Sequence, residues 1–433
     1  MKSLARRRGP VVLSSFLATL LVSTLDGLPE LAADSPGLPG ISVTSVTSAA
    51  SVGSDIRFAA GTSALSIPFE EDGGHILLRG EIGGSGPLWL GLDTGATGSL
   101  IDSDRARDLG LRFGEAFQVI GAAGGVDGAE VSGASIRLPG VELRDQSMTA
   151  LNLDFLARGK GKDVAALLGY DVFNRFVVEI DYAGGRLHLY DPASYVYRGA
   201  GESFPLRFEG DHPYVRAKFE LPGKRVVEGE LVVDTGSPFS LMLAAPFVAQ
   251  NRLLEGIGPT IASKARGVGG EMLLSIGRLQ GIRLGSFLLA GPVTVFPQNL
   301  GGEITARGNA GNLGAGFLRR FRVIFDYSRG RMILEPNAAF GDRDEYDMSG
   351  VSLVAEGADF GTIKVARLIE PSPAHEAGLR REDVIVSVDG KAAAAIGLAN
   401  LRSLFRENGR EVRLDVRRGS EVLAMQVKMR RLI

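Results

Sequence analysis

The chain of 433 residues contains no cysteine, and this absence excludes several kinds of site. Without thiols there is no disulfide, no zinc–thiolate centre, no cysteine nucleophile and no lipidated cysteine anchor. Histidine is scarce, with four residues and no His-x-x-x-His spacing of the kind that zinc peptidases use. A Gly-x-Ser-x-Gly sequence and a phosphate-binding loop are also missing. We therefore expect no metal and no cofactor.

An excess of positive charge is missing too. The formal net charge is −2, so the chain has no overall basic field for binding nucleic acid. Hydrophobic residues make up 45% of the chain, enough for sizeable cores, and the length fits two or three domains. The 59 glycines show no collagen-like period and fit a protein rich in strands and loops. We expect a mainly β fold.

The N-terminus has the pattern of an export signal over residues 1–33. Lys2 and Arg6 to Arg8 form a positive head, an apolar stretch follows, and Ala32-Ala33 is a plausible cleavage edge. The apolar run is short for a membrane span. We expect a protein that is exported to the periplasm or secreted, with an uncleaved membrane anchor as the alternative. Residues 34–63, rich in Ser, Gly, Ala and Pro, are expected to be a flexible linker.

One short sequence motif occurs twice in the chain. An apolar run ends abruptly in Asp93-Thr94-Gly95, and a second ends in Asp234-Thr235-Gly236. A carboxylate at the end of a buried strand is costly unless it is used. The two copies suggest that two half-sites meet.

The repeat continues downstream of both copies. Leu168-Gly169 corresponds to Leu313-Gly314, and Asp181-Tyr182 corresponds to Asp326-Tyr327, each pair 145 positions apart (326 − 181). Such a long repeat indicates a duplicated domain. Strands are predicted at 75–82, 88–92, 214–221 and 228–233, and helices at 102–110, 241–254 and 398–406.

A glycine-rich stretch lies between each Asp-Thr-Gly and its Leu-Gly partner. The glycines are Gly121, Gly124 and Gly125 in the first half and Gly267, Gly269 and Gly270 in the second. Residues that favour strands flank both stretches, which predicts mobile hairpins. Two ordinary surface turns are the alternative.

Two aspartates within hydrogen-bonding distance share one proton, because both cannot ionise cheaply. The ionised partner can take a proton from water, and the protonated partner can polarise a carbonyl group. Thr94 and Thr235 can hydrogen-bond across the junction, and Gly95 and Gly236 let backbone amides approach the carboxylates. The pattern predicts attack of water on an amide without a metal, serine or cysteine.

These residues resemble the retropepsin-like and pepsin-like aspartic peptidases in a two-lobe, single-chain form. The resemblance rests on both Asp-Thr-Gly copies with their distal Leu-Gly pairs and covers about residues 64–337. It implies two closed β-barrel lobes, 64–200 and 201–337, related by pseudo-twofold symmetry. It also implies Asp93 and Asp234 as the catalytic pair and the two glycine-rich hairpins as flaps. The sequence departs from the family at Asn312, which replaces a hydrophobic residue, and neither flap tip carries a tyrosine.

The C-terminal part, residues 350–433, resembles a PDZ domain of the bacterial protease type and follows a polar, acidic linker at 338–349. The resemblance rests on Ser372-Pro373-Ala374, Ala377-Gly378-Leu379 and Val388-Asp389-Gly390-Lys391. PDZ domains bind C-terminal peptides by adding a strand to a sheet edge. The expected peptide-binding residues are Phe360, Gly361, Thr362 and Ile363. A docking module without a peptide ligand is the alternative. Asp342 and Asp344, in the linker, are expected to be solvated.

The sequence therefore predicts an exported aspartic endopeptidase that acts on peptide or protein substrates, with a PDZ domain for substrate or partner recognition. It predicts no nucleic-acid partner, and membrane contact only if the N-terminal segment stays uncleaved. A catalytically inactive peptide-binding protein on the same fold is the alternative. A further alternative is that the first lobe pairs with the first lobe of another chain.

Overall fold

The computed structural model describes residues 11–12, 55–298 and 308–433. Apart from Val11 and Val12, the predicted export signal lies outside the described residues, as does most of the predicted linker. Those two residues form β1 (Val11–Val12), which pairs in parallel with β7 (Arg112–Ile120). Among the described residues, no helix is both long and apolar enough to cross a membrane.

The first part of the structure, residues 55–190 and here called lobe 1, contains a closed ring of six strands. Its pairings run β4–β5–β10–β6–β9–β8 and return from β8 to β4. The elements of lobe 1 besides β7 are β2 (Ile56–Phe58), β3 (Ser63–Asp72), β4 (His75–Ile82), β5 (Leu88–Leu92), β6 (Leu100–Asp102), α1 (Ser103–Asp108), β8 (Gly125–Leu138), β9 (Val141–Leu151), α2 (Asp154–Lys160), β10 (Val164–Leu168), α3 (Tyr170–Phe173), β11 (Val177–Asp181) and β12 (Arg186–Tyr190).

The second part, residues 202–336 and here called lobe 2, has corresponding pairings in the order β15–β16–β23–β17–β22–β19. The strand that follows β19, β20, pairs with β15, as β8 does with β4 in lobe 1. Its elements are β13 (Glu202–Pro205), β14 (Arg207–Glu209), β15 (His212–Leu221), η1 (Pro222–Lys224), β16 (Arg225–Asp234), β17 (Leu241–Leu243), α4 (Ala245–Gln250), β18 (Ile261–Gly267), β19 (Gly270–Arg278), β20 (Gly281–Leu284), β21 (Phe287–Ala290), β22 (Val293–Pro297), β23 (Gly311–Gly314), α6 (Ala315–Leu318), β24 (Phe321–Asp326), η2 (Tyr327–Arg329) and β25 (Arg331–Pro336).

The two lobes share a sheet and a core. The two Asp-Tyr hairpins of the sequence repeat pair with each other through β11 and β24, in the order β3–β12–β11–β24–β25–β13. One apolar cluster runs from Leu92 of lobe 1 through Phe173 to Phe325 of lobe 2. The mainly β class is confirmed, while the pseudo-twofold relation of the lobes stays a prediction.

Residues 351–433 form a separate C-terminal module with its own apolar core. Its sheet has the order β26–β27–β28–β30–β31, with β29 paired to β28. The elements are β26 (Val351–Glu356), β27 (Thr362–Leu368), α7 (Pro373–Glu376), β28 (Val384–Val388), β29 (Lys391–Ala392), α8 (Ala393–Ile396), α9 (Leu398–Leu404), β30 (Glu411–Arg418) and β31 (Glu421–Lys428).

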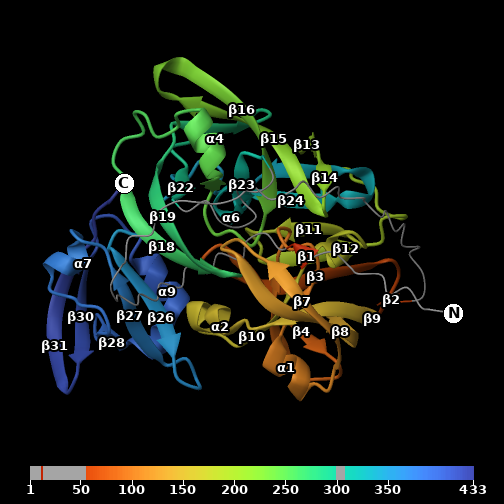
Figure 1. Ribbon diagram of the computed structural model, residues 1–433, viewed down its shortest axis with the longest axis horizontal. Helices are drawn as coiled ribbons and strands as arrows, with labels where there is room; N and C mark the ends of the chain where they lie inside the picture. Colours follow the sequence, from red (N-terminus) through yellow and green to blue (C-terminus); the bar gives the residue numbers. More distant parts are fainter. Residues whose placement is uncertain (1–10, 13–54, 299–307) are drawn as a thin grey trace, which may run out of the picture.

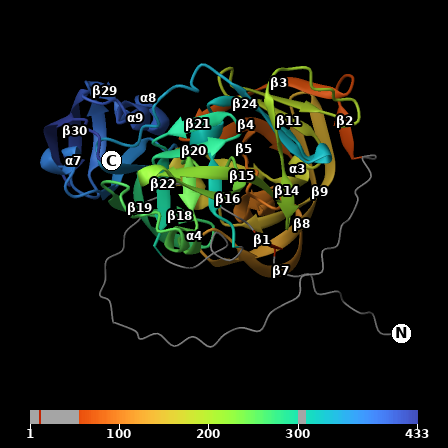
Figure 2. The same cartoon turned by 90° about the horizontal axis from the view of Figure 1, so that it is seen from above.

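The C-terminal module docks on both lobes. In Figure 1 its strands, in blue, lie at one side of the molecule, with α2 of lobe 1 next to β26, and in Figure 2 the blue module again lies at one side of the two lobes. The Arg402 side chain of α9 donates hydrogen bonds of 2.7 Å to the carbonyl oxygens of Gly159 in α2 and Leu353 in β26. One half-buried guanidinium therefore joins lobe 1 to the module.

Two expectations from the sequence are wrong. The predicted helix at 241–254 begins as strand β17, because Leu241 and Met242 pair with β22 and β23, and only Ala245–Gln250 is helical. Asp344 is buried rather than solvated: its carboxylate accepts hydrogen bonds from Ser240 Oγ at 2.6 Å and from the Val293 N–H at 2.7 Å. The segment between lobe 2 and the C-terminal module is thus fastened to lobe 2.

We expect Arg402→Ala to loosen the C-terminal module, because it leaves two carbonyl groups without their charged donor. The free energy of unfolding should fall by about 1–3 kcal/mol in chemical denaturation. Arg417→Ala, an exposed arginine of β30, is the matched control and should change it by less than about 0.5 kcal/mol. Equal effects of the two substitutions would contradict the docking role of Arg402.

Candidate active site

Each Asp-Thr-Gly sequence is held at the end of a strand by a parallel neighbour. The Asp93 N–H donates to the Leu168 carbonyl at 2.9 Å, and Asp234 is in register with Gly314. Gly169 and Gly314, which follow Leu168 and Leu313, let these strand ends lie close to the loops that carry the aspartates. A Cβ on Gly169 would lie 2.5 Å from the Gly98 carbonyl oxygen, and one on Gly314 would lie 2.2 Å from that of Phe239. The Leu-Gly pairs therefore fix the position of both aspartate loops.

The two threonines join the loops by reciprocal hydrogen bonds. The Thr94 N–H donates to Thr235 Oγ1 at 3.0 Å, and the Thr235 N–H donates to Thr94 Oγ1 at 2.9 Å. Each hydroxyl also donates across the junction, Thr94 to the Val233 carbonyl at 2.7 Å and Thr235 to the Leu92 carbonyl at 3.0 Å. All four bonds are buried, so the two loops have one relative position.

The structure brings the two carboxyl groups together. Asp93 and Asp234 are 1% and 0% exposed. The Asp93 carboxyl lies against Gly236 of lobe 2, where an added Cβ would be 2.5 Å from Asp93 Cγ. The Gly95 N–H donates to Asp93 Oδ1 at 2.8 Å, and the Gly236 N–H donates to Asp234 Oδ1 at 2.9 Å. The predicted supporting glycines therefore contact the carboxylates directly.

The environment of the pair favours one shared proton. Burial raises the pKa of the Asp93 carboxyl well above its ordinary value, and the charge of Asp234 raises it further. The backbone N–H groups of Gly95 and Gly236 act in the opposite direction. Two adjacent carboxyls that exchange a single proton can supply a base and an acid at the same place.

Two further residues at the pair were not identified from the sequence as functional. The Asn312 side-chain amide donates to Asp234 Oδ2 at 2.6 Å. The Tyr327 ring is buried between the rings of Tyr170 and Phe173, and both carboxyls contribute to raising the pKa of its phenol, after burial and Tyr170. The sequence signals were the departure from the family pattern at 312 and the repeated Asp-Tyr.

The two predicted flaps are β-hairpins that meet at their tips. They are β7–β8, which turns at Gly121 to Gly124, and β18–β19, which turns at Val268 and Gly269. The Ala123 N–H donates to the Val268 carbonyl at 3.1 Å. A Cβ on Gly121 would lie 2.3 Å from the Val268 carbonyl oxygen. These glycines allow the two tips to touch. Gly125 begins β8, Gly267 ends β18, and Gly270 begins β19.

Each flap tip is buried in the opposite lobe. Val268 of lobe 2 is 3% exposed and belongs to the apolar cluster of Leu77 and Ala96 in lobe 1. Ala122 of lobe 1 is 1% exposed and belongs to the cluster of Phe239 in lobe 2. The flaps are therefore closed, and a substrate would need them to open.

A cleft of about 570 Å³ lies beside the closed flaps. It is lined by residues of both hairpins and of α2, among them Val126, Arg158 and Arg266. An extended peptide chain that lies in this cleft would contact both flaps.

The four residues predicted to bind a peptide in the C-terminal module do not lie on a free edge of its sheet. Phe360 and Gly361 lie in the loop before β27, and Thr362 and Ile363 begin that strand. Ile363 pairs with β26 on one side and β28 on the other, so no strand can be added there. The edge strands at the two ends of this sheet are β26, next to β27, and β31.

The β26 edge is covered by lobe 1. Gly161, at the end of α2, lies between Ala355 of β26 and Leu398 of α9, where an added Cβ would be 3.2 and 3.5 Å from their Cβ atoms. Arg158 forms an ion pair with Glu356 at the end of β26. The contacts favour a docking role for this edge.

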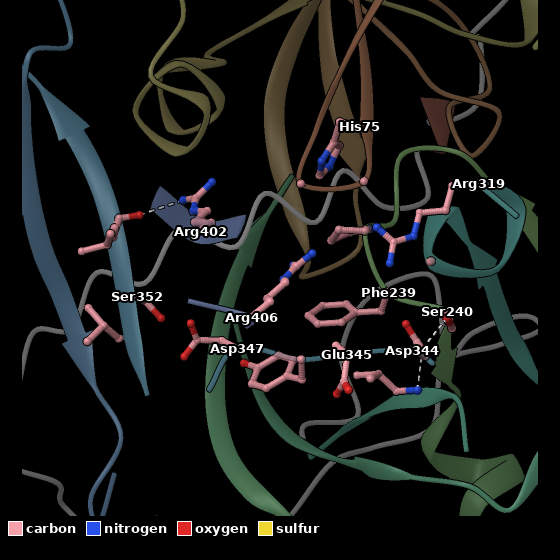
Figure 3. Close-up of a pocket in the computed structure, with 18 of the residues that line it drawn as sticks. His75, Phe239, Ser240, Arg319, Asp344, Glu345, Asp347, Ser352, Arg402 and Arg406 are labelled. Atoms are coloured by element: carbon pink, nitrogen blue, oxygen red, sulfur yellow. Dashed lines mark hydrogen bonds between the residues drawn. The ribbon is translucent and has the colours of Figure 1, made fainter. Parts of the chain in front are cut away.

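A charged cavity of about 100 Å³ lies where the two lobes and the C-terminal module meet (Figure 3). His75, Arg319, Arg402 and Arg406 line it together with Asp344, Glu345 and Asp347. Neither Asp93 nor Asp234 is among its lining residues. In the part of the chain that the structure describes, no group of three or more histidine or carboxylate side chains is arranged to hold a metal ion.

Comparison with known proteins identifies two domains. Residues 78–172 match the family model described as aspartyl protease, and residues 364–418 match that of the PDZ domain. No curated protein matches the chain. Among solved structures, a photosystem II D1 C-terminal processing protease is 24% identical over 20% of this chain, with a TM-score of 0.19. The match spans 24% of that protein, about a quarter of its length, and carries no conclusion about its activity here.

We expect Thr94→Val to destabilise the junction of the lobes, because the Thr235 N–H and the Val233 carbonyl lose their buried partner. The free energy of unfolding should fall by about 2–5 kcal/mol. Thr260→Val, at an exposed position, provides the same chemical change as a control. A loss below about 0.5 kcal/mol for Thr94→Val would show that the reciprocal bonds do not hold the lobes.

A second prediction concerns Lys160, which is 4% exposed and donates to the Asp72 carbonyl at 2.9 Å. Burial lowers its pKa to about 7. Between this value and the ordinary lysine pKa, the unfolded chain binds the proton and the folded chain does not, so stability should rise with pH over this window. Lys160→Met should remove this dependence. The stability of wild type relative to the variant should increase by about 2–4 kcal/mol from pH 6.5 to 9.5, and a constant offset would contradict the assignment.

Proposed function

Since the chain carries an aspartyl protease domain and a C-terminal PDZ domain, we propose that it is an exported aspartic endopeptidase whose catalytic pair is Asp93 and Asp234. The observation that carries the proposal is the buried junction at which both carboxyls meet between the interlocked threonines Thr94 and Thr235. Export rests on the sequence pattern of residues 1–33.

The proposed reaction is attack of water on a peptide carbonyl. The ionised carboxylate removes a proton from the water as it attacks, and the protonated carboxyl donates a hydrogen bond to the carbonyl oxygen. The tetrahedral intermediate collapses when a proton reaches the amide nitrogen and the C–N bond breaks. Burial of the pair strengthens these interactions, since little water competes for them.

The flaps and the cleft beside them support a peptide or protein as the substrate. An extended segment of a peptide or protein would pass between the hairpins at 120–125 and 266–270 after their tips separate. The PDZ domain is proposed to take part in recognition of a protein partner or substrate, and its β26 edge first has to separate from α2.

We expect Asp93→Asn and Asp234→Asn each to reduce peptide cleavage by on the order of 10³-fold or more, because one carboxyl cannot serve as base and acid together. Wild type and variants are incubated with a peptide library, and the new ends are read by mass spectrometry. Asp108→Asn, an exposed aspartate of α1, is the matched control and should cleave as wild type does.

The same variants should remain folded. Burial raises the pKa of Asp93 above its ordinary value, so stability falls as the pH rises from the ordinary pKa to the raised one, and Asp93→Asn removes this loss. The wild-type rate should follow a bell-shaped pH profile on the acid side. Cleavage that survives either substitution, or a wild-type profile that is flat through neutrality, would contradict the assignment of Asp93 and Asp234 as the catalytic pair. A wild type that cleaves no peptide would favour the inactive peptide-binding protein.

A further inference from the structure

The two halves of the site differ in chemistry at one position of the repeat. Asn312 of lobe 2 is in register with Val232, two residues before Asp234, and Leu167 of lobe 1 is in register with Gly91, two residues before Asp93. Both side chains are buried, at 1% and 0% exposure. Lobe 2 therefore has a side-chain amide where lobe 1 has a hydrocarbon.

The Asn312 amide is held in place by its backbone. Its strand, β23, lies between β16 and β17, and residue 312 pairs with Val232 on one side and Met242 on the other. From this position the Nδ2 atom donates to Asp234 Oδ2 at 2.6 Å, while the Gly236 N–H donates to Asp234 Oδ1 at 2.9 Å. Both oxygens of this carboxyl thus accept a hydrogen bond from lobe 2.

A hydrogen bond from an N–H group favours the charged form of a carboxyl, because the carboxylate is the stronger acceptor. In a pair that shares one proton, such a donor also decides which member is ionised. Leu167, the counterpart of Asn312, has no polar atom to offer Asp93. The asymmetry therefore acts on Asp234 alone.

We propose that Asn312 is a positioning residue that keeps Asp234 as the ionised member of the pair, so that Asp234 is the base and Asp93 carries the shared proton. This assignment rests on the proposed peptidase function. Burial and the charge of Asp234, which raise the pKa of Asp93, agree with it. The phenol of Tyr327 interacts with both carboxyls and with the phenol of Tyr170, and burial raises the pKa of both phenols.

The proton balance of the reaction follows from the assignment. Asp234 accepts a proton from the attacking water, whose oxygen bonds to the carbonyl carbon, while Asp93 gives its proton to the carbonyl oxygen. Asp234 then gives its proton to the leaving nitrogen as the C–N bond breaks, and Asp93 regains a proton from a hydroxyl of the intermediate. The sum is one amide and one water converted into a carboxylic acid and an amine.

Two substitutions remove the amide but change packing in opposite ways. Asn312→Leu reproduces the residue of lobe 1, and Asn312→Ala leaves a small space. In both, the acid limb of the pH profile of kcat/KM, which reports ionisation of the base, should move up by about one pH unit. Leu167→Met, the matched change in lobe 1, should leave the acid limb where it is in wild type. An unmoved limb in both Asn312 variants, or a shift in only one of them, would overturn the proposal.

A second measurement needs no cleavage. In protein labelled with ¹³C at the aspartate carboxyls, Asp93→Asn leaves Asp234 as the single carboxyl of the pair, and its titration is followed by NMR with and without Asn312→Ala. The titration midpoint of Asp234 should rise by about one pH unit when the amide is removed. An unchanged midpoint refutes the role of Asn312 even if the enzyme is active. A wild type that cleaves no peptide refutes the proposed function, while the NMR titration still decides the role of Asn312.

Discussion

Two carboxyl groups are buried against each other, and the surrounding structure stabilises this arrangement. Such a pair is costly in a dry interior unless a proton is shared and the remaining charge accepts hydrogen bonds. Backbone N–H groups of Gly95 and Gly236 supply part of that stabilisation, and the reciprocal threonine bonds keep the loops at one separation. A small relative movement of the lobes would break several buried hydrogen bonds together. The junction is therefore a rigid point between the two lobes, in addition to the sheet and the core that they share.

The flaps form a second contact between the two lobes. The tip of each hairpin rests in the apolar cluster of the opposite lobe, through Ala122 and Val268, so neither lobe completes its own core. Both aspartates come from one chain, and the described residues place all parts of the site within it. Pairing of lobe 1 with the same lobe of a second chain is not needed to complete the site.

Much of this arrangement could be predicted from the sequence, because the same short motifs occur in both halves of the repeat. The two Asp-Thr-Gly copies and their Leu-Gly partners indicated which strands deliver the carboxyls. The edge strand of the PDZ sheet could not be predicted in the same way, because the sequence does not show that Ile363 pairs with β26 on one side and β28 on the other. The burial of Asp344 could not be predicted from the sequence either, because its hydrogen-bond partners Ser240 and Val293 are distant in sequence.

Two similar lobes that each supply one carboxyl do not by themselves determine which carboxyl is the base and which is the acid. Two equivalent halves would give two equivalent carboxyls, yet the proposed reaction requires one base and one acid at any moment. A symmetric pair assigns these roles by the position of one mobile proton. A single buried amide such as that of Asn312 lowers the energy of one of the two arrangements, and a hydrogen bond to a charged group is typically strong enough to favour it about tenfold or more. The departure from the repeat at this position is thus the smallest change that can give the two halves different chemical roles.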